Sequence, residues 1–309
     1  MGLVKTANCI FGETIVKEGF RDEKIFVLDS DVSRASYTYL FKENFPERFL
    51  NVGIAEQNMA SIAAGLALKG YKPVITSLAK FISLRCLDQV VNSIAYPKLN
   101  VLMVGIYAGI SIGKDGATHQ TVEDIGVLKS IPNMSIINPC SHREVNELVG
   151  QSFKYQGPTY LRLTAGIPET QLSEEKIEFG KARVMTNGDQ LTVVTTGVMT
   201  GKVLNVIKEE DLEEKVSLIH THTIKPIDAE SIRKSARKTL KVITIEDHNV
   251  IGGIGESVSS LLCNEEGVVV KIIGLNDVFG CSDDAEELYN KYNLCEESIK
   301  NYILQNISK

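Results

Sequence analysis

Short apolar runs recur along the first half of the chain, and each is followed by sequence with helical or loop character. Because these runs are continuously apolar and do not alternate with polar residues, they are typical of strands buried on both faces of a parallel sheet. The pattern therefore predicts an α/β domain whose strands include residues 25–28, 73–75, 101–104, 135–137 and 159–161.

The alternation stops between residues 166 and 186, where polar residues gather, and we place a linker there. It resumes afterwards with βαβ patterning, and strands are predicted near residues 190–194, 216–219, 241–245 and 268–273. We therefore expect two consecutive α/β domains, a parallel-sheet domain over residues 1–165 and a smaller domain over residues 187–309.

The composition agrees with two globular domains and narrows the classes of function. The chain has 309 residues, 43% of them hydrophobic, which is enough for two cores. Its net charge of −6 argues against nucleic-acid binding, which usually needs a basic face. The six cysteines lack metal-ligand spacing, and we see neither a signal peptide nor a membrane-spanning run. We therefore expect reduced thiols, a cytoplasmic location and no membrane association.

The segment around Glu56 carries the first chemical signal. Residues 51–59 read Asn-Val-Gly-Ile-Ala-Glu-Gln-Asn-Met, which predicts a strand end, a tight turn at Gly53 and a helix that begins near Glu56. A carboxylate at the start of a helix with a buried apolar face rarely serves packing alone. Its simpler explanation is that it complements the helix N-terminus.

A second signal follows the apolar strand at residues 101–106. Residues 113–120 read Gly-Lys-Asp-Gly-Ala-Thr-His-Gln, and loops at the carboxyl ends of parallel strands form ligand sites. We expect Asp115 and His119 to share one site, where a histidine can transfer a proton and a carboxylate can orient it or bind a substrate hydroxyl. A loop histidine capped by its neighbours is the alternative.

A third signal lies between these two, where residues 75–90 predict a strand end followed by a helix. Leu78, Phe81 and Leu84 are its apolar positions, and Phe81 offers a face on which a heteroaromatic ring can stack. Ordinary core packing would also explain Phe81. The glycine-rich residues 197–202 and 252–255 lack the spacing of a phosphate or dinucleotide fingerprint and predict turns that open helices. A nucleotide-binding or docking module remains the non-enzyme alternative.

In this order and spacing, the acid, the aromatic residue and the Asp-Gly-x-Thr-His loop resemble the pyrimidine-binding half of transketolase, with 1-deoxy-D-xylulose-5-phosphate synthase a close relative. The resemblance continues through residues 138–139, 160–163, 247–248 and 252–255, and so covers nearly the whole chain. The family binds the diphosphate of thiamine diphosphate and Mg²⁺ through a separate domain with a Gly-Asp-Gly motif, which is absent from this chain. The resemblance thus implies half of an enzyme, whose N-terminal partner subunit holds the diphosphate and the metal, and it implies a heterotetramer.

The resemblance also implies roles for the residues near the cofactor. Glu56 matches the family's acid that hydrogen-bonds the pyrimidine nitrogen, which favours the imino tautomer that removes a proton from the thiazolium carbon. Phe81 matches the ring that stacks on the aminopyrimidine, while Leu78 and Leu84 stand where transketolases often have aromatic residues. Asp31 and Val32 align with an acidic residue and an apolar wedge beside the cofactor.

For the substrate, the resemblance implies that Asp115 and His119 contact the ketose hydroxyls and that Arg162 binds the far phosphate, a task suited to a guanidinium. An ion pair is the alternative for Arg162. Tyr107 stands in place of a phosphate-contacting histidine, Ala35 in place of a serine, and Ala108 where the synthase carries an arginine. We expect the three histidines of the second half, His220, His222 and His248, to be structural or interfacial. We also expect that the chain itself binds no metal.

Together these observations predict the C-terminal subunit of a split transketolase, which transfers a two-carbon ketol unit from a ketose phosphate to an aldose. Subunits of a deoxyxylulose phosphate synthase or of a 2-oxo acid dehydrogenase are the alternatives within the same cofactor class. The Asp-Gly-x-Thr-His loop disfavours the dehydrogenase.

Overall fold

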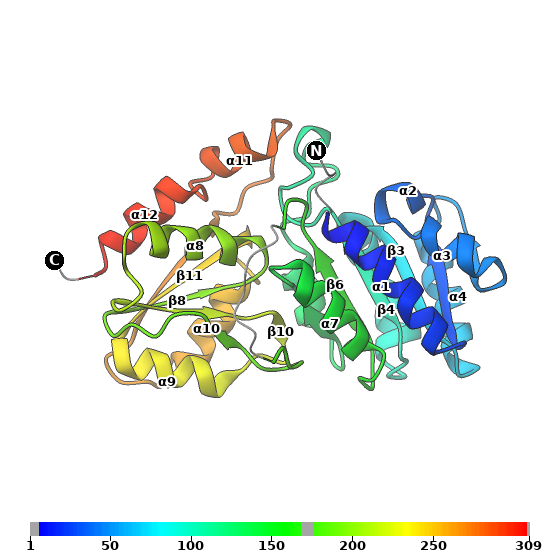
Figure 1. Cartoon of the computed structure of the whole chain (residues 1–309), viewed down its shortest axis with the longest axis horizontal. Helices are drawn as coiled ribbons and strands as arrows, with labels where there is room; N and C mark the ends of the chain where they lie inside the picture. Colours follow the sequence, from blue (N-terminus) through cyan, green and yellow to red (C-terminus); the bar gives the residue numbers. More distant parts are fainter. Residues whose placement is uncertain (1–5, 168–175, 308–309) are drawn as a thin grey trace.

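The computed structural model describes residues 6–167 and 176–307, which fold into two α/β domains (Figure 1). The predicted fold class is therefore confirmed, with a seven-stranded sheet in the first domain and a five-stranded sheet in the second. Residues 168–175 of the expected linker lie outside the described residues. Within the described ranges, no helix combines the length and the apolar character needed to cross a membrane.

The strands of the first sheet lie in the order β10-β5-β6-β4-β3-β1-β2. All neighbours are parallel except β10, which comes from the second half of the chain and pairs antiparallel with β5 at the edge. The strand bounds are β1 Ile25–Asp29, β2 Phe49–Asn51, β3 Lys72–Leu78, β4 Leu102–Ile106, β5 Ser135–Ile137, β6 Thr159–Leu163 and β10 Thr223–Lys225.

Both faces of this sheet are covered by helices, which explains why its strands are apolar throughout. Successive strand residues point to opposite faces: Val27 packs in the core under α1, α3 and α7, whereas Leu28 packs in the core under α4, η2, η3 and α6. The helix bounds are α1 Ala7–Arg21, α2 Ser33–Ser36, α3 Tyr39–Asn44, η1 Pro46–Arg48, α4 Glu56–Leu68, η2 Phe81–Arg85, α5 Leu87–Gln89, η3 Val90–Ala95, η4 Gly113–Asp115, α6 Asp124–Lys129 and α7 His142–Ser152.

The second sheet has the order β12-β11-β8-β9-β7, with only β7 antiparallel to its neighbour. Helices α8, α11 and α12 share one core with the sheet, and α9 and α10 share the other. The bounds are β7 Arg183–Val184, β8 Leu191–Thr195, α8 Val198–Glu209, β9 Val216–His220, α9 Ala229–Thr239, β11 Lys241–Asn249, α10 Ile254–Leu262, β12 Val269–Leu275, α11 Ala285–Lys291 and α12 Glu296–Leu304. Residues 183–184, expected in the linker, therefore form a strand.

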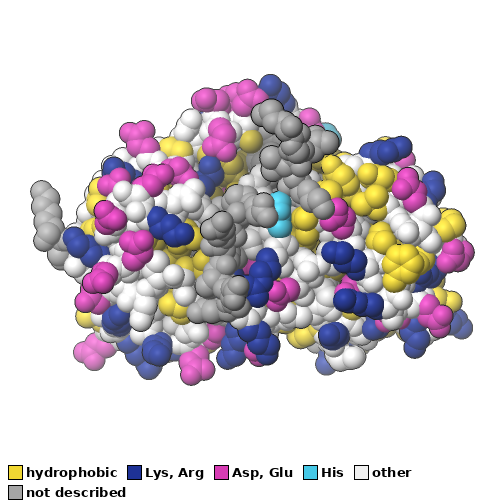
Figure 2. Space-filling model, in the orientation of Figure 1, with side chains coloured by type: hydrophobic (Ala, Val, Ile, Leu, Met, Phe, Trp, Pro, Cys, Tyr) yellow, Lys and Arg dark blue, Asp and Glu magenta, His cyan; other side chains and the backbone are white. Residues whose placement is uncertain are grey.

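Acidic and basic side chains are interspersed over the face of the molecule shown in Figure 2. On that face neither sign of charge forms a continuous patch, which agrees with the modest net charge of −6. This face therefore lacks the one-signed field that long-range attraction of a highly charged polymer requires.

Candidate active site

A cavity of about 490 Å³ opens at the carboxyl ends of β3 and β4. Ligands bind at this edge of open parallel sheets because the loops that follow the strands converge there. The cavity brings together several of the residues predicted from sequence, although they are spread over some 85 positions of the chain. Its lining consists of Ala35, Leu78, Ile106, Tyr107, Ser111, Ile112, Asp115 and His119.

Glu56 is the first residue of α4, as the sequence predicts. Gly53 forms the turn before this helix and has a positive φ of 72°, a conformation that favours glycine. The Glu56 side chain is 1% exposed, and it accepts hydrogen bonds from Ser77 Oγ at 3.0 Å and from Arg85 Nη1 at 2.9 Å. Among the described residues, these two side chains are the hydrogen-bond partners of the Glu56 carboxylate. It accepts no hydrogen bond from an N–H of the first helical turn. Glu56 therefore makes specific side-chain contacts in addition to lying in the first turn of α4, where its charge complements the helix N-terminus.

Phe81 and Arg85 are the first and last residues of the π-helix η2. The Arg85 guanidinium lies over the Phe81 ring, 3.9 Å from its centroid, and the His119 ring meets Phe81 edge-on at 5.3 Å. Phe81 therefore links Glu56, through Arg85, to the loop that carries His119. Short π-helical segments often occur at functional sites. Leu84 is partly buried in the same turn and is not among the residues that line the cavity.

The loop that carries Asp115 and His119 is held from both sides. Within the loop, Thr118 Oγ1 and His119 Nδ1 share a hydrogen bond of 2.9 Å. Gln120 Nε2 donates to the Gly113 carbonyl at 3.0 Å and to the Cys281 carbonyl at 2.8 Å, so the second domain fixes this loop. Neighbour capping of His119 is thus present, and it leaves the ring on the cavity wall.

Tyr107, Asp31 and Val32 follow the ends of β4 and β1. Tyr107 has a φ of 55° and lines the cavity, and burial raises the pKa of its phenol. Asp31 is exposed, accepts a hydrogen bond from Asn51 Nδ2 at 3.0 Å, and does not line the cavity. Val32 is partly buried against the domain core, and its N–H donates to Asp29 Oδ1 at 2.7 Å.

Arg162 requires a correction, because the structure does not bring it to the cavity. Its side chain has no exposed surface and forms two ion pairs, from Nε to Asp124 Oδ2 at 3.0 Å and from Nη1 to Asp247 Oδ1 at 2.8 Å. Its Nη2 donates to the Asp247 carbonyl at 3.2 Å, and Tyr160 Oη donates to Asp124 at 2.8 Å. The guanidinium thus joins the two domains, and the expectation that it binds a substrate phosphate is wrong for this structure.

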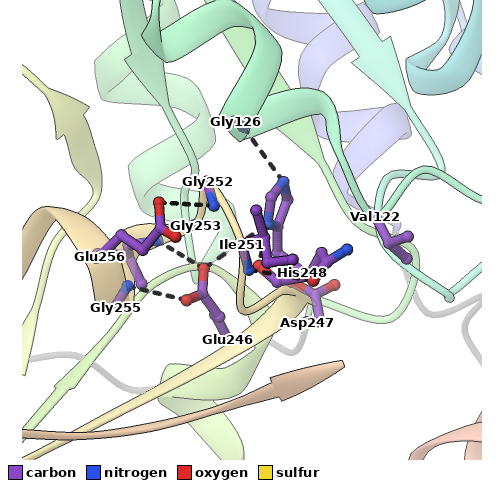
Figure 3. A network of polar contacts seen from close by, with 12 residues as sticks. Val122, Gly126, Glu246, Asp247, His248, Ile251, Gly252, Gly253, Gly255 and Glu256 are labelled. Carbon is purple, nitrogen blue, oxygen red and sulfur yellow. Dashed lines mark hydrogen bonds and ion pairs between the residues drawn. The ribbon is translucent and has the colours of Figure 1, made fainter. Parts of the chain in front are cut away.

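The polar groups around Arg162 continue along β11 and into α10 (Figure 3). The Gly126 N–H donates to His248 Nε2 at 3.4 Å, across the domain interface. Glu246 accepts hydrogen bonds from Ile254 N at 2.7 Å and Gly255 N at 2.9 Å, and so caps α10. His248 and the glycine-rich turn at residues 252–253 therefore have structural surroundings, as expected from sequence.

A second buried cluster joins the domains at Glu144 of α7. Its carboxylate pairs with Arg183 at 3.1 Å and with His220 Nε2 at 2.9 Å. Burial alone would raise the pKa of Glu144, but the charge and hydrogen bond of His220 outweigh it and lower that pKa. Cys140 lies near enough to complete a three-ligand group with Glu144 and His220, their ligand atoms lying within 4.8 Å of one another. Because Arg183 already neutralises the Glu144 carboxylate, we interpret this group as an interdomain ion-pair cluster and not as a metal site.

Sequence reasoning missed Ser77 and Arg85, the two partners of Glu56. Ser77 lies within the apolar run of β3, and a polar residue in such a run was the signal that could have marked it as a site residue. Arg85 follows Phe81 by four residues, a spacing that places two side chains on one face of a helix.

Two family models match this chain and together cover most of it. Residues 5–167 match the transketolase pyrimidine-binding domain, and residues 180–299 match the transketolase C-terminal domain. A Methanocaldococcus jannaschii protein provisionally named as a transketolase C-terminal section is 38% identical over 100% of this chain and 98% of its own length. A 6-deoxy-6-sulfo-D-fructose transketolase subunit from a Clostridium species is 35% identical over 90% of this chain and 87% of its own length.

Among solved structures, a split-gene transketolase described as an inactive β4 tetramer superposes with a TM-score of 0.89. It is 36% identical to this chain, and the match covers 97% of this chain and 98% of that one. Sequence and structure therefore agree over both domains.

Proposed function

The chain belongs to the transketolase family, and from this premise we propose that it is the C-terminal subunit of a split transketolase. The proposed reaction moves a two-carbon ketol unit from a ketose phosphate to an aldose acceptor. Support comes from the near full-length match to a C-terminal section and to a split-gene enzyme. The sequence has no Gly-Asp-Gly motif, so we assign the diphosphate and Mg²⁺ contacts of thiamine diphosphate to an N-terminal partner subunit, with two copies of each chain in the active assembly.

The residues around Glu56 fit the aminopyrimidine ring of this cofactor. A planar, donor-bearing group, the Arg85 guanidinium, already lies against Phe81 and hydrogen-bonds the buried Glu56 carboxylate. When bound, thiamine diphosphate supplies an electron sink for breaking and forming the carbon–carbon bond beside the ketose carbonyl. Glu56 would hold a proton at the pyrimidine nitrogen, while Phe81 would fix the plane of the ring by stacking. Leu78, Leu84, Val32 and Asp31 would border it.

Asp115 and His119 would bind the hydroxyl groups of the ketose, since both line the cavity beside Phe81. His119 can accept and return a proton there because its ring faces the cavity while Thr118 holds Nδ1. Tyr107, which also lines the cavity, would add its phenol. Among the described residues the cavity lining contains no lysine or arginine, so with Arg162 buried this wall contacts hydroxyl groups and not the anionic end of the sugar.

The single observation that carries the proposal is the buried Glu56 carboxylate at the start of α4, beside a stacking ring. The test reconstitutes the chain with its N-terminal subunit, thiamine diphosphate and Mg²⁺, adds xylulose 5-phosphate and ribose 5-phosphate, and identifies products by mass spectrometry. A seven-carbon ketose phosphate that disappears with Glu56→Gln supports ketol transfer. Product formation that survives Glu56→Gln refutes the assigned role of this acid.

A further inference from the structure

Arg85 makes two contacts that define one position in space. Its guanidinium carbon lies 3.9 Å from the Phe81 ring centroid, and its Nη1 donates to Glu56 Oε2 at 2.9 Å. A planar cation therefore lies between an aromatic face and a buried carboxylate, and both contacts favour it. Glu56 and Phe81 are also the two groups to which we have assigned the aminopyrimidine ring.

Two planar groups cannot make this pair of contacts at once. A ring that stacks on Phe81 and also hydrogen-bonds Glu56 must lie on the side of Phe81 that faces the carboxylate. Arg85 occupies that side, at the separation of two carbon groups in van der Waals contact. The His119 ring lies beside Phe81 in a T-shaped contact, with ring centroids 5.3 Å apart and an interplanar angle of 69°.

The surroundings of Arg85 allow it to leave. Its side chain is 42% exposed, whereas that of Glu56 is 1% exposed. If Arg85 moves into solvent, Ser77 stays bonded to Glu56 Oε1 at 3.0 Å, and Oε2 becomes free for a new partner. The exchange replaces one hydrogen bond to Oε2 with another and therefore leaves no buried oxygen unpaired.

We propose that, in the chain without cofactor, Arg85 occupies the place of the aminopyrimidine ring and that the cofactor binds by displacing it. The inference rests on the proposed function of Glu56 and Phe81. Arg85 thereby keeps a buried carboxylate paired until the cofactor arrives, and it lowers the apparent affinity for the ring. The apparent dissociation constant rises in inverse proportion to the fraction of molecules in which Arg85 is displaced.

The test uses the full-length chain alone with 4-amino-2-methylpyrimidine as the probe, and measures affinity by ligand-detected NMR titration. Arg85→Met keeps the length of the side chain and removes the planar cation, so we expect about tenfold tighter binding, corresponding to an open fraction near one tenth in the unmodified chain. The gain should vanish in the double variant Arg85→Met with Glu56→Gln. Arg237→Met, which removes an exposed arginine paired with Glu265 far from the site, is the matched control and should change nothing.

Binding by Arg85→Met that is equal to or weaker than that of the unmodified chain overturns the inference, and so does absence of binding in every variant. Circular dichroism checks the fold. Arg85→Lys, whose ammonium keeps the charge but not the plane, provides an intermediate gain if Arg85→Met does not fold. The product assay separates the two ideas: loss of ketol transfer in Glu56→Gln without any affinity gain in Arg85→Met refutes only the displacement. Ketol transfer that persists in Glu56→Gln refutes the role assigned to this acid, and absence of the seven-carbon product from the unmodified complex refutes the proposed function.

Discussion

Arg162 and Asp247 form an ion pair across the domain interface, with Nη1 2.8 Å from Oδ1 and both side chains at most 1% exposed. Replacing Arg162 by methionine would leave Asp124 and Asp247 buried without their cation. We expect a loss of about 3–5 kcal/mol in the free energy of unfolding, the usual result of breaking a buried ion pair from one side. Urea denaturation measures it.

Arg237→Met is the control, because the Arg237–Glu265 pair is exposed on the side of the arginine and should contribute little. If Arg162→Met left stability unchanged but raised the KM for the ketose, the arginine would act on substrate, as the sequence first suggested.

Glu56→Gln should reduce kcat of the reconstituted complex at least 100-fold, because an amide cannot hold and release the proton assigned to the carboxyl. Ser77→Ala removes only the hydrogen bond to Glu56 Oε1, whose ordinary value is about 0.5–1.5 kcal/mol, and should reduce kcat about two- to tenfold. Steady-state kinetics on the two variants distinguishes them, and equal losses would argue against a special role for Glu56.

His119→Gln should lower kcat/KM for the ketose about 100-fold or more if the ring moves a proton, with cofactor affinity unchanged. Lys114→Ala is the neighbouring control, because Lys114 pairs with Asp284 on the exposed side of the same loop. Coupled-enzyme kinetics and a cofactor titration provide the two readings. A loss of cofactor affinity alone would reassign His119 to the cofactor.

His222 should make stability depend on pH. Burial and the nearby His220 lower its pKa from 6.5 to about 4. As pH falls below 6.5, His222 becomes protonated in the unfolded chain but stays neutral in the folded protein. Its contribution to the free energy of unfolding is therefore fully present above pH 6.5 and is lost progressively down to pH 4. The difference corresponds to about 3 kcal/mol. The pKa of His248 is also lowered by burial, which adds to the same trend.

Denaturation of His222→Gln at several pH values between 4 and 7 tests this dependence. The variant should show a smaller loss of stability on acidification than the unmodified chain. An unchanged slope would assign the effect to other groups.

Gly280→Ala should disturb the substrate loop from the second domain. A Cβ at Gly280 would collide with Oε1 of the Gln120 side chain, and Nε2 of the same side-chain amide donates to the Gly113 and Cys281 carbonyls. We expect a severalfold rise in the KM for the ketose. Gly65→Ala is the control, since nothing lies within 4 Å of its added Cβ and α4 should gain about 0.5–1 kcal/mol of stability. Unchanged kinetics in Gly280→Ala would show that the loop does not depend on this contact.

The sequence predicts the parts of the fold that follow from local pattern. Continuous apolar runs identify the central strands, and Gly53 with the residues after it identifies the start of α4 at Glu56. The short strands β7 and β10 are not predicted, because they have only two and three residues and too little periodicity to recognise.

The site divides in the same way. Loop residues near strand ends, such as Asp115 and His119, can be predicted because parallel topology brings strand ends together. Arg162 could not, since its partner Asp247 is 85 residues away and only tertiary packing decides whether a strand arginine meets a carboxylate or a ligand. Arg85 could not be predicted either, because its role depends on its contacts with the Phe81 ring and the Glu56 carboxylate.

Because of strand β10, the first sheet contains residues from both halves of the chain. A fragment that ends near residue 167 would lose it and leave the hydrogen-bonding edge of β5 open, where another copy could pair. Separate expression of the first domain should therefore yield self-associating material. A split designed to separate the two domains would have to keep residues 223–225 with the first domain, because these residues complete the first sheet.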